Sequence, residues 1–430
     1  MRYRINQIKL NIDEGQDKLE KAILRKIRRK GIKIYDLKII KESVDARKKP
    51  DVKLVYTLDF SCDTELLLPE AKENTYSFPV GTFKRRPVIA GFGPCGIFAA
   101  LVLAEAGHRP VVIERGAPVD ERVADVQRFW NEGILDPESN VQFGEGGAGT
   151  FSDGKLTTGI RDVRIGKVLS EFVEAGASDS ILYKQRPHIG TDKLRIIVKN
   201  LRKKIEGLGG QVMFRTKLTG IETEKTDKGH VLKRIRIKSA NGEEQTIITD
   251  TLILATGHSA RDVFEMLYDE NVTMMQKPFS IGVRVEHSQD MINKVQYGRA
   301  EIAEKIGAAD YKLNFKCKNG RGVYTFCMCP GGLVINASSE ENTSVTNGMS
   351  NSGRDENTAN SALLVDVKTE DFPSAHPLAG IEFQRKYEKL AYINGNGNLP
   401  VSNYGKFRTN EVDPVRKSLP DFAAEAIIEA

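Results

Sequence analysis

Residues 87–116, PVIAGFGPCGIFAALVLAEAGHRPVVIERG, are the stretch around which the rest of the chain is organised. Residues 87–90 are apolar and predict a buried strand, residues 91–96 predict a glycine turn, residues 97–106 predict a helix, and residues 110–113 predict a second buried strand. A G-x-G-x-x-G spacing that follows a strand and opens a helix is typical of a dinucleotide-binding βαβ unit. We therefore predict an α/β fold with a Rossmann-like domain.

Each glycine of this turn has its own physical task. Gly91 allows the tight turn, Gly93 lets the backbone approach a pyrophosphate, and Gly96 lets helix and strand pack closely. Glu114 ends the second strand, where a carboxylate accepts hydrogen bonds from an adenosine ribose and repels a 2′-phosphate. FAD or NAD therefore fits better than NADP. A membrane span over residues 88–104 is the weaker alternative, because the segment is short and interrupted at Pro94.

Composition bounds the class of protein. The chain has 430 residues, of which 40% are hydrophobic and 28% charged, as in soluble proteins of two or three domains. Five cysteines without paired spacing and an N-terminus without a secretory pattern predict a cytoplasmic protein. The first 86 residues carry 21 Lys and Arg against 13 Asp and Glu. A solvated face explains this better than nucleic acid, because aromatic stacking residues are not interleaved with the basic run.

The basic N-terminal segment predicts a small α/β domain over residues 1–84, with a ferredoxin-like arrangement. Residues 3–10, 32–40 and 52–60 have the pattern of strands, and residues 16–30 have helical spacing. Residues 70–86 contain Pro79 and little periodicity, which is typical of a linker.

A second glycine-rich stretch occupies residues 140–156, NVQFGEGGAGTFSDGKL. Its glycines leave many backbone amides free to lie against a planar ligand or an anion; they are Gly144, Gly146, Gly147, Gly149 and Gly154. Lys155 could stabilise negative charge on a reduced flavin ring. The alternative is a flexible surface loop with an exposed lysine, which is the weaker reading after a dinucleotide fold.

The middle of the chain continues the α/β pattern. A helix is expected over residues 193–208 and strands over residues 211–224 and 247–255. Leu218 falls where backbone often meets an adenine, and the small residues Ala255, Thr256 and Gly257 let the chain pass close to a cofactor. His188 precedes the helix and is a candidate base, although a structural role is the more common one.

The last third predicts short strands at residues 281–287, 322–329 and 333–338, the last two forming a hairpin across Pro330. Cys327 and Cys329 would share one face of an extended strand, where their separation is near the outer limit for a disulfide. Buried apolar packing is therefore preferred over a redox pair, and one thiol that faces substrate is the alternative. Residues 336–360 predict a long polar active-site loop in which Arg354 is the best anion-binding residue. No metal-ligand spacing occurs.

Several strings resemble the bacterial FAD-dependent dehydrogenase family known as NAD(P)/FAD-dependent oxidoreductases. Besides the two glycine stretches they are RPHIGTDKLR (186–195), DTLILATGHSARDVFEMLY (250–268), YTFCMCPGGLVINAS (324–338), TNGMSNSGRDENTANSALLV (346–365) and HPLAGIEFQRKYEKLA (376–391). Relatives continue to a second flavin-contacting glycine segment, which this chain would lack. The resemblance implies an FAD-binding domain at 85–260 with a helical insertion at about 161–210, an inserted α+β cap or substrate domain at 261–380, and a truncated return segment at 381–430.

The resemblance and the residues together define the expected site. FAD would contact Gly91, Gly93, Pro94, Gly96, Glu114, Arg115, Gly144, Gly146, Gly147, Gly149, Lys155, Leu218, Ala255, Thr256 and Gly257. Lys155, Cys327 and Arg354 are the catalytic candidates. The expected function is hydride transfer through FAD from a small-molecule substrate, with NAD(P)H as a candidate electron donor. The alternative is a dinucleotide-sensing protein whose basic N-terminal domain docks an acidic partner or RNA.

Overall fold

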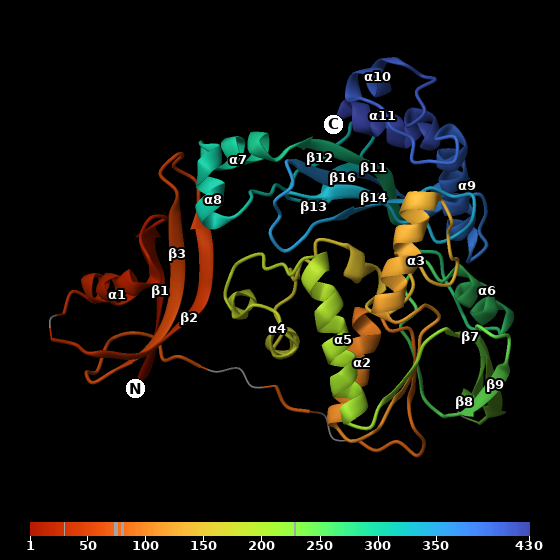
Figure 1. Ribbon diagram of the computed structural model, residues 1–430, viewed down its shortest axis with the longest axis horizontal. Coiled ribbons are helices and arrows are strands. Elements are labelled where there is room, and N and C mark those ends of the chain that lie inside the picture. Colours follow the sequence, from red (N-terminus) through yellow and green to blue (C-terminus); the bar gives the residue numbers. More distant parts are fainter. Residues whose placement is uncertain (30, 73–75, 79–80, 228) are drawn as a thin grey trace.

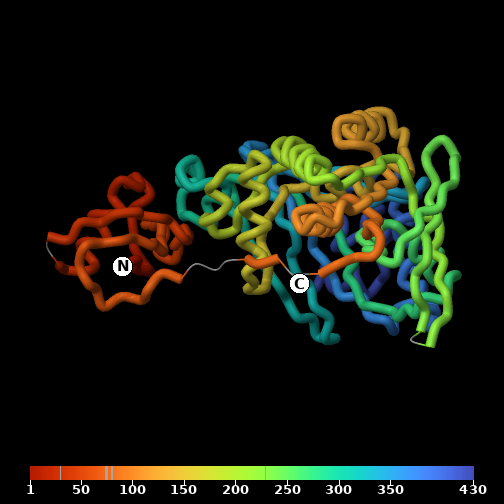
Figure 2. Tube along the Cα trace, turned by 90° about the horizontal axis from the view of Figure 1, so that it is seen from below, coloured from red at the N-terminus to blue at the C-terminus, as the bar shows by residue number. Residues whose placement is uncertain are grey.

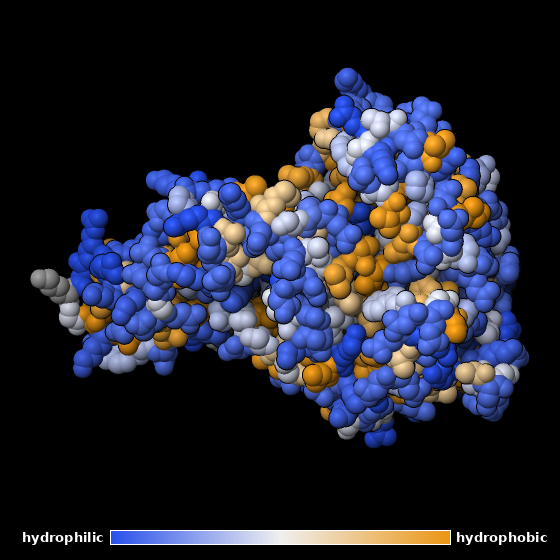
Figure 3. Space-filling view, turned by 45° about the horizontal axis from the view of Figure 1, so that its top comes forward, coloured by the Kyte–Doolittle hydropathy of each residue, from blue (hydrophilic) through white to orange (hydrophobic). Residues whose placement is uncertain are grey.

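The computed structural model describes residues 1–430 except 30, 73–75, 79–80 and 228. Part of the predicted linker, at residues 73–75 and 79–80, thus lies outside the described residues. A small N-terminal module lies at one end of a larger body, and the chain crosses between them once (Figures 1 and 2). On the side of the molecule that Figure 3 shows, the surface of the N-terminal module is mostly hydrophilic, whereas apolar side chains gather in a hollow of the larger body.

The N-terminal module is a three-stranded antiparallel sheet with one helix packed on one of its faces. The sheet order is β1-β3-β2, formed by β1 (Arg2–Asn11), β2 (Ile34–Asp45) and β3 (Lys53–Cys62). After η1 (Gln16–Lys18), α1 (Leu19–Ile27) buries Leu19 and Ile23 against the sheet, and it ends because Arg28 adopts the left-handed conformation. The described residues of the module thus contain three strands and one α-helix, fewer than the ferredoxin-like βαββαβ unit that was predicted.

The module is docked on the larger body. Apolar residues Ile12, Ala46 and Val52 share a cluster with Ile292 and Tyr297 of the body. The cluster lies against α7 (Gln289–Tyr297), η4 (Ala300–Ile302) and α8 (Ala303–Ile306), which are drawn in teal beside β2 and β3 in Figure 1. The two parts therefore share buried apolar surface in addition to the linker.

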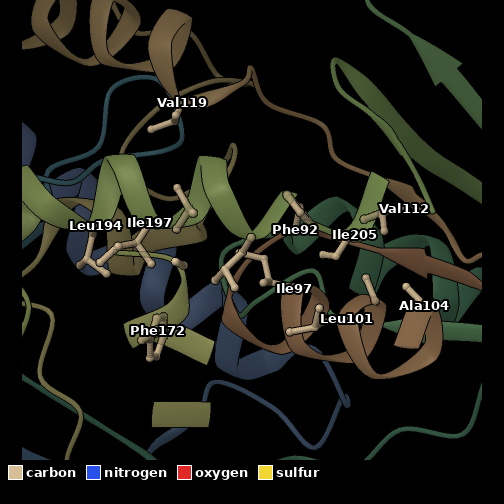
Figure 4. Close-up of a cluster of buried hydrophobic side chains, with 14 of the residues drawn as sticks. Phe92, Ile97, Leu101, Ala104, Val112, Val119, Phe172, Leu194, Ile197 and Ile205 are labelled. Carbon is tan, nitrogen blue, oxygen red and sulfur yellow. The ribbon is translucent and has the colours of Figure 1, made fainter. Parts of the chain in front are cut away.

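A parallel four-stranded sheet of order β10-β4-β5-β6 forms the centre of the body, as the glycine pattern predicts. Its strands are β4 (Val88–Ala90), β5 (Val111–Ile113), β6 (Gln211–Met213) and β10 (Leu252–Leu254). Helix α2 (Pro94–Glu105) packs on one face together with α5 (Thr191–Gly207), which lies in the crossover from β5 to β6. Figure 4 shows side chains of both helices in one cluster, with Ile205 of α5 beside Val112 of β5 and with Leu194 and Ile197 at the far end of the cluster.

The other helices and a second sheet surround this centre. The helices are α3 (Val119–Glu132), α4 (Arg164–Glu174), η3 (Asp179–Leu182) and α6 (Arg261–Asp269), and η2 (Gly147–Phe151) lies in the second glycine stretch. An antiparallel meander β7-β8-β9 is built from β7 (Thr216–Thr226), β8 (Gly229–Ser239) and β9 (Glu244–Ile248).

Two predicted strands are each divided between sheets. Residues 211–224 span β6 and the start of β7, and residues 247–255 span the end of β9 and β10. The second break lies at residues 249–251, where the Thr249 hydroxyl donates to the carbonyl of Thr251 at 3.1 Å and makes a turn between the sheets. Apolar periodicity alone does not reveal such a change of partner, because the apolar residues continue from one half to the other.

The last third forms an antiparallel sheet of order β11-β16-β13-β12. Its strands are β11 (Phe279–Ser288), β12 (Asn314–Lys316), β13 (Gly322–Cys329) and β16 (Thr358–Val367). The predicted hairpin of residues 322–329 with 333–338 is wrong, since β13 pairs with β16 and β14 (Leu333–Asn336) pairs with β15 (Thr346–Met349). Residues 336–360, which were predicted to form a long polar loop, also contain β15 and the start of β16.

The C-terminal helices cover this sheet. After η5 (Thr369–Asp371) come α9 (Ala379–Asn394), α10 (Tyr404–Thr409), η6 (Arg416–Ser418) and α11 (Asp421–Glu429). Ala423 and Ala426 of α11 pack against Val323 and Val365 of the sheet, and α11 lies beside this sheet in Figure 1. The small alanine side chains let the helix approach the sheet closely.

Candidate functional site

A cavity of about 410 Å³ lies at the carboxyl ends of β4, β5 and β10. In parallel α/β sheets this is the position where ligands bind, at the point where the strand order reverses on either side of the first strand. Its lining includes eleven of the predicted cofactor residues: Gly91, Gly93, Pro94, Glu114, Arg115, Gly147, Gly149, Leu218, Ala255, Thr256 and Gly257. Segments far apart in sequence are thus brought to one pocket.

The three glycines of the first turn differ in what surrounds them. A methyl group on Gly91, which has a φ of 102°, would lie 2.3 Å from the carbonyl oxygen of Ala255, so the turn packs directly on the end of β10. A methyl group on Gly96 would lie 1.9 Å from the carbonyl of Gly91. At Gly93 the nearest atom is the Cα of Gly147 at 3.7 Å, so open space remains there. Gly96 serves the packing and does not line the cavity.

Gly93 and Gly147 together form a cradle of bare backbone. A methyl group on Gly147 would lie 2.9 Å from the Cα of Gly93, so the two glycine stretches approach each other at this point. Helix α2 begins here with Gly93 as its N-cap, and no side chain caps it. The amides of its first turn are therefore available to a phosphate at the positive end of the helix. This donor set fits the pyrophosphate of FAD.

Glu114 binds the backbone of both glycine stretches through its side chain. Its buried carboxylate accepts hydrogen bonds from the backbone amides of Phe92 at 2.7 Å, Gly116 at 2.9 Å and Gly144 at 2.9 Å. A carboxylate has about four acceptor positions, so the one remaining is what a ribose hydroxyl could use. The sequence predicted the ribose contact and missed the three backbone contacts.

Arg115 lines the cavity as an ion-paired side chain. Its guanidinium pairs with Asp262 at 2.5 Å and Glu138 at 2.8 Å and stacks on the ring of Phe143. Burial lowers the pKa of Arg115, but the two carboxylates more than offset this effect, so the group stays charged. Its position is fixed before any ligand binds.

Arg122 was missed by sequence reasoning, although it holds the second glycine stretch in place. It is 0% exposed, and its guanidinium donates to the carbonyls of Asn140 at 2.8 Å, Glu145 at 2.7 Å and Val141 at 2.9 Å. Gly144 packs on its side chain and, like Gly146, does not line the cavity. Burial lowers the pKa of Arg122 to about 10. An arginine in an amphipathic helix gives no sequence signal of this role.

The three catalytic candidates come together around another residue that the sequence did not single out, Asp153. Its buried carboxylate pairs with Arg354 at 2.9 and 2.5 Å and with Lys155 at 2.8 Å. Burial raises the pKa of Asp153, but the two cations outweigh this and hold it well below its ordinary value. Cys327 lies close enough for the charges of Lys155 and Asp153 to act on it. Asp153 follows Gly149 of the cavity by four residues through the end of η2.

His188 borders the same group of charges. Its Nε2 contacts the carbonyl of Ser352 at 3.2 Å, and its backbone bridges that of Lys155. Burial, reinforced by the positive charge of Arg354, lowers the pKa of His188 to about 4, so the ring is neutral at pH 7. The structure thus places this candidate base beside the predicted catalytic residues.

Within the described ranges, no group of three or more His, Cys, Asp and Glu is arranged to hold a metal ion. No helix in the part of the chain that the structure describes combines the length and apolar composition that crossing a membrane requires.

Comparison with known proteins identifies the class first. Residues 278–427 match the model of a family described as "FAD-dependent protein, C-terminal domain-like", and residues 2–61 match a domain of unknown function (DUF8436). FAD is thus the cofactor, in agreement with the cradle at Gly93 and Gly147. The predicted loss of the C-terminal flavin-contacting segment is not supported, because the C-terminal family model itself extends to residue 427.

A close relative then places the chain. An uncharacterized protein of Clostridium beijerinckii is 47% identical over 461 residues, covering 100% of this chain and 85% of that protein. The chain belongs to the same family as this clostridial protein.

Similar solved structures are more distant. They include THI4 of Thermovibrio ammonificans, with 15% identity, a TM-score of 0.30, and coverage of 45% of this chain and 66% of that one. The tetracycline destructase Tet(51) has 11% identity and a TM-score of 0.32, with 71% of this chain and 63% of that one covered. The monooxygenase PieE, in complex with FAD and substrate, has 14% identity and a TM-score of 0.29, with 71% and 47% covered. Similarities of this size carry no argument here.

Proposed function

We propose that this chain is an FAD-dependent oxidoreductase of the dehydrogenase type, which takes a hydride from a small-molecule substrate onto its flavin and passes the electrons on. The observation that carries the proposal is the continuity of the second glycine stretch. Gly147 and Gly149 line the dinucleotide cavity, and Asp153 and Lys155 follow immediately in the charged cluster. A ligand that begins at the α2 N-terminus would extend towards Lys155 and Arg354.

When bound, FAD supplies the two-electron chemistry, and the residues supply binding and electrostatics. The backbone at Gly93 and Gly147 would hold the pyrophosphate, and Glu114 would orient the ribose. Lys155 and Arg354 provide positive charge that favours an anionic reduced ring or an anionic substrate. His188, neutral at pH 7, is a candidate to accept a proton. Asp153 keeps the two cations in place.

The experiment that tests the proposal is the visible absorbance spectrum of the purified chain, followed by identification of the compound released on heating. A flavin spectrum with released FAD, bleached anaerobically by added NAD(P)H or by a candidate substrate, is the expected result. A colourless protein that also fails to take up added FAD would contradict the proposal. Bleaching by NAD(P)H alone would identify the electron donor and leave the substrate to be found.

The binding-protein alternative has no observation that favours it. Several basic side chains of the N-terminal module are paired internally, as in Arg4 with Asp59 and Arg47 with Asp45. The module is also partly covered by the larger body. A cytoplasmic location and the absence of a nucleic-acid partner remain predictions.

A further inference from the structure

Cys327 and Cys329 do not lie on a regular extended strand. The pairing of β13 with β16 shifts between Phe326 and Cys329, and Cys327 has a φ of 47°, in the left-handed region that a side chain rarely adopts. The resulting kink brings the two cysteines together, and the Cys329 thiol donates to the carbonyl of Cys327 at 3.3 Å. The spacing argument against a redox pair assumed an extended strand, and that assumption is wrong here.

The two thiols differ in their surroundings. Cys327 is partly exposed, whereas Cys329 is fully buried. The neighbouring Cys329 thiol lowers the pKa of Cys327 to about 6, aided by Lys155 and Arg284 and opposed by burial and Asp153. The pKa of Cys329 is raised by the neighbouring Cys327 and by burial. A thiolate at the accessible position and a thiol behind it are the arrangement of an attacking and a resolving cysteine.

Arg284 of β11 holds the pair from the other side. Its guanidinium donates to the carbonyl of Cys327 at 2.8 Å and lies 3.7 Å from the Cys329 sulfur. Asn360, which faces Cys329 across the sheet, fixes this arginine by accepting two of its hydrogen bonds, at 2.8 and 2.6 Å. With Lys155 and Arg354 against Asp153, the charges around the pair sum to an excess of positive charge.

Asn360 supplies an independent sign of a ligand. Its side chain is 0% exposed, yet its amide nitrogen has no hydrogen-bond partner among the described residues. A buried donor without a partner is costly, and such donors are expected to meet an acceptor that arrives with a ligand. Here the acceptor would reach the donor beside the resolving cysteine.

We propose that Cys327 and Cys329 form a redox-active thiol pair that reduces a small anionic disulfide. The Cys327 thiolate attacks one sulfur of the substrate, the substrate S–S bond breaks, and the first thiolate leaves. Cys329 then attacks the Cys327 sulfur, its proton goes to the second leaving thiolate, and a Cys327–Cys329 disulfide remains. Bound FAD, once reduced, would supply the two electrons that, with one proton from solvent, restore the Cys327 thiolate and the Cys329 thiol. This last step rests on the proposed function and names a disulfide as its substrate class.

The thiol chemistry is tested on the purified 430-residue chain by mass spectrometry, with flavin content measured in the same samples. After reduction and desalting, Cys327 should be alkylated by iodoacetamide at pH 7 at least tenfold faster than the exposed Cys95. Glutathione disulfide, a small anionic probe, should convert the pair to an internal disulfide. Cys329→Ser should stop at a stable mixed disulfide on Cys327, and Cys327→Ser should not react at the pair. Cys317→Ser, which replaces a buried cysteine in the cluster under α11, should react as the unaltered chain does.

Two outcomes would overturn the inference. One is alkylation of Cys327 no faster than that of Cys95, together with no mixed disulfide in Cys329→Ser. The other is equal reaction with cystamine, a cationic disulfide, which would remove the anionic substrate class. Because thiol reactivity is read without turnover, a chain that lacks flavin would contradict the proposed function and the flavin-dependent reset while leaving the thiol result standing.

Discussion

The carboxylate of Asp153 receives a two-point ion pair from the guanidinium of Arg354, a residue 201 positions further along the chain. Asp153 follows the second glycine stretch, and Arg354 lies between β15 and β16, so this contact ties the dinucleotide-binding half to the C-terminal sheet. Lys155 forms a second ion pair with the same carboxylate. Four predictions start from this arrangement and its neighbours.

Asp153→Asn should destabilise the protein strongly. The change keeps the size of the side chain but leaves the partly buried Arg354 and Lys155 without their counter-charge, which costs about 3–5 kcal/mol for buried pairs. Urea unfolding followed by circular dichroism measures the loss. Asp162→Asn is the matched control, because its pair with Arg164 lies at the surface and should matter little. Equal stability of both variants would show that the buried pair has no structural weight.

Arg122→Met should also loosen the second glycine stretch. Three backbone carbonyls lose their shared donor, and we expect a loss of about 3 kcal/mol or more in the free energy of unfolding. FAD should dissociate more readily as well, which equilibrium dialysis measures. Arg128→Met, on the exposed side of the same helix, is the control. Unchanged FAD retention in Arg122→Met would mean that the loop is held without it.

Gly93→Val should abolish FAD binding without unfolding the chain. Gly93 has ordinary backbone angles, with φ −76° and ψ −174°, and the space at its Cα is open, so a larger side chain fits the fold but fills the cradle beside Gly147. Fluorescence titration with FAD measures the loss, and the melting temperature of the apoprotein checks the fold. Gly159→Ala, at another unobstructed glycine, should bind as before. FAD bound normally by Gly93→Val would remove the pyrophosphate site from this turn.

His188 should make stability depend on pH. Its pKa in the folded protein is about 4 against an ordinary value of 6.5, so the folded state binds this proton less readily than the unfolded chain does. The contribution of His188 to the free energy of unfolding is therefore constant above pH 6.5 and falls as the pH is lowered towards 4. The total loss is about 3 kcal/mol. His188→Gln should flatten this part of the profile, whereas the exposed His230→Gln should not. Parallel profiles for all three proteins would exclude the effect.

Sequence reasoning succeeded where local pattern and fold agree. The apolar runs and the glycine spacing of residues 87–116 predicted β4, α2 and β5, and helical spacing predicted α5. Each of these elements buries apolar residues that lie close together in the sequence, so the local pattern indicates the element. Most of the predicted cofactor residues line one cavity for the same reason: turns after parallel strands all open at the same edge of a sheet.

It failed where partners are chosen over long distances. Residues 322–338 have the pattern of a hairpin, yet β13 takes β16 and β14 takes β15, because strands of similar apolar pattern can pair in more than one order. In the sequence, Asp153 and Arg122 are single charged residues whose neighbours form no recognisable motif. Only burial by segments far along the chain reveals that each one is a centre of hydrogen bonds.

The sequence by itself determined a dinucleotide-binding βαβ unit, its acidic strand end and the second glycine stretch, since these depend on backbone freedom and on the period of apolar residues. Only the tertiary structure decided that Glu114 ties three loops together, that Asp153 gathers Lys155 and Arg354, and that a left-handed Cys327 faces Cys329. Those features are contacts between distant segments or a local departure from regular pairing, and they exist only after the sheets have packed.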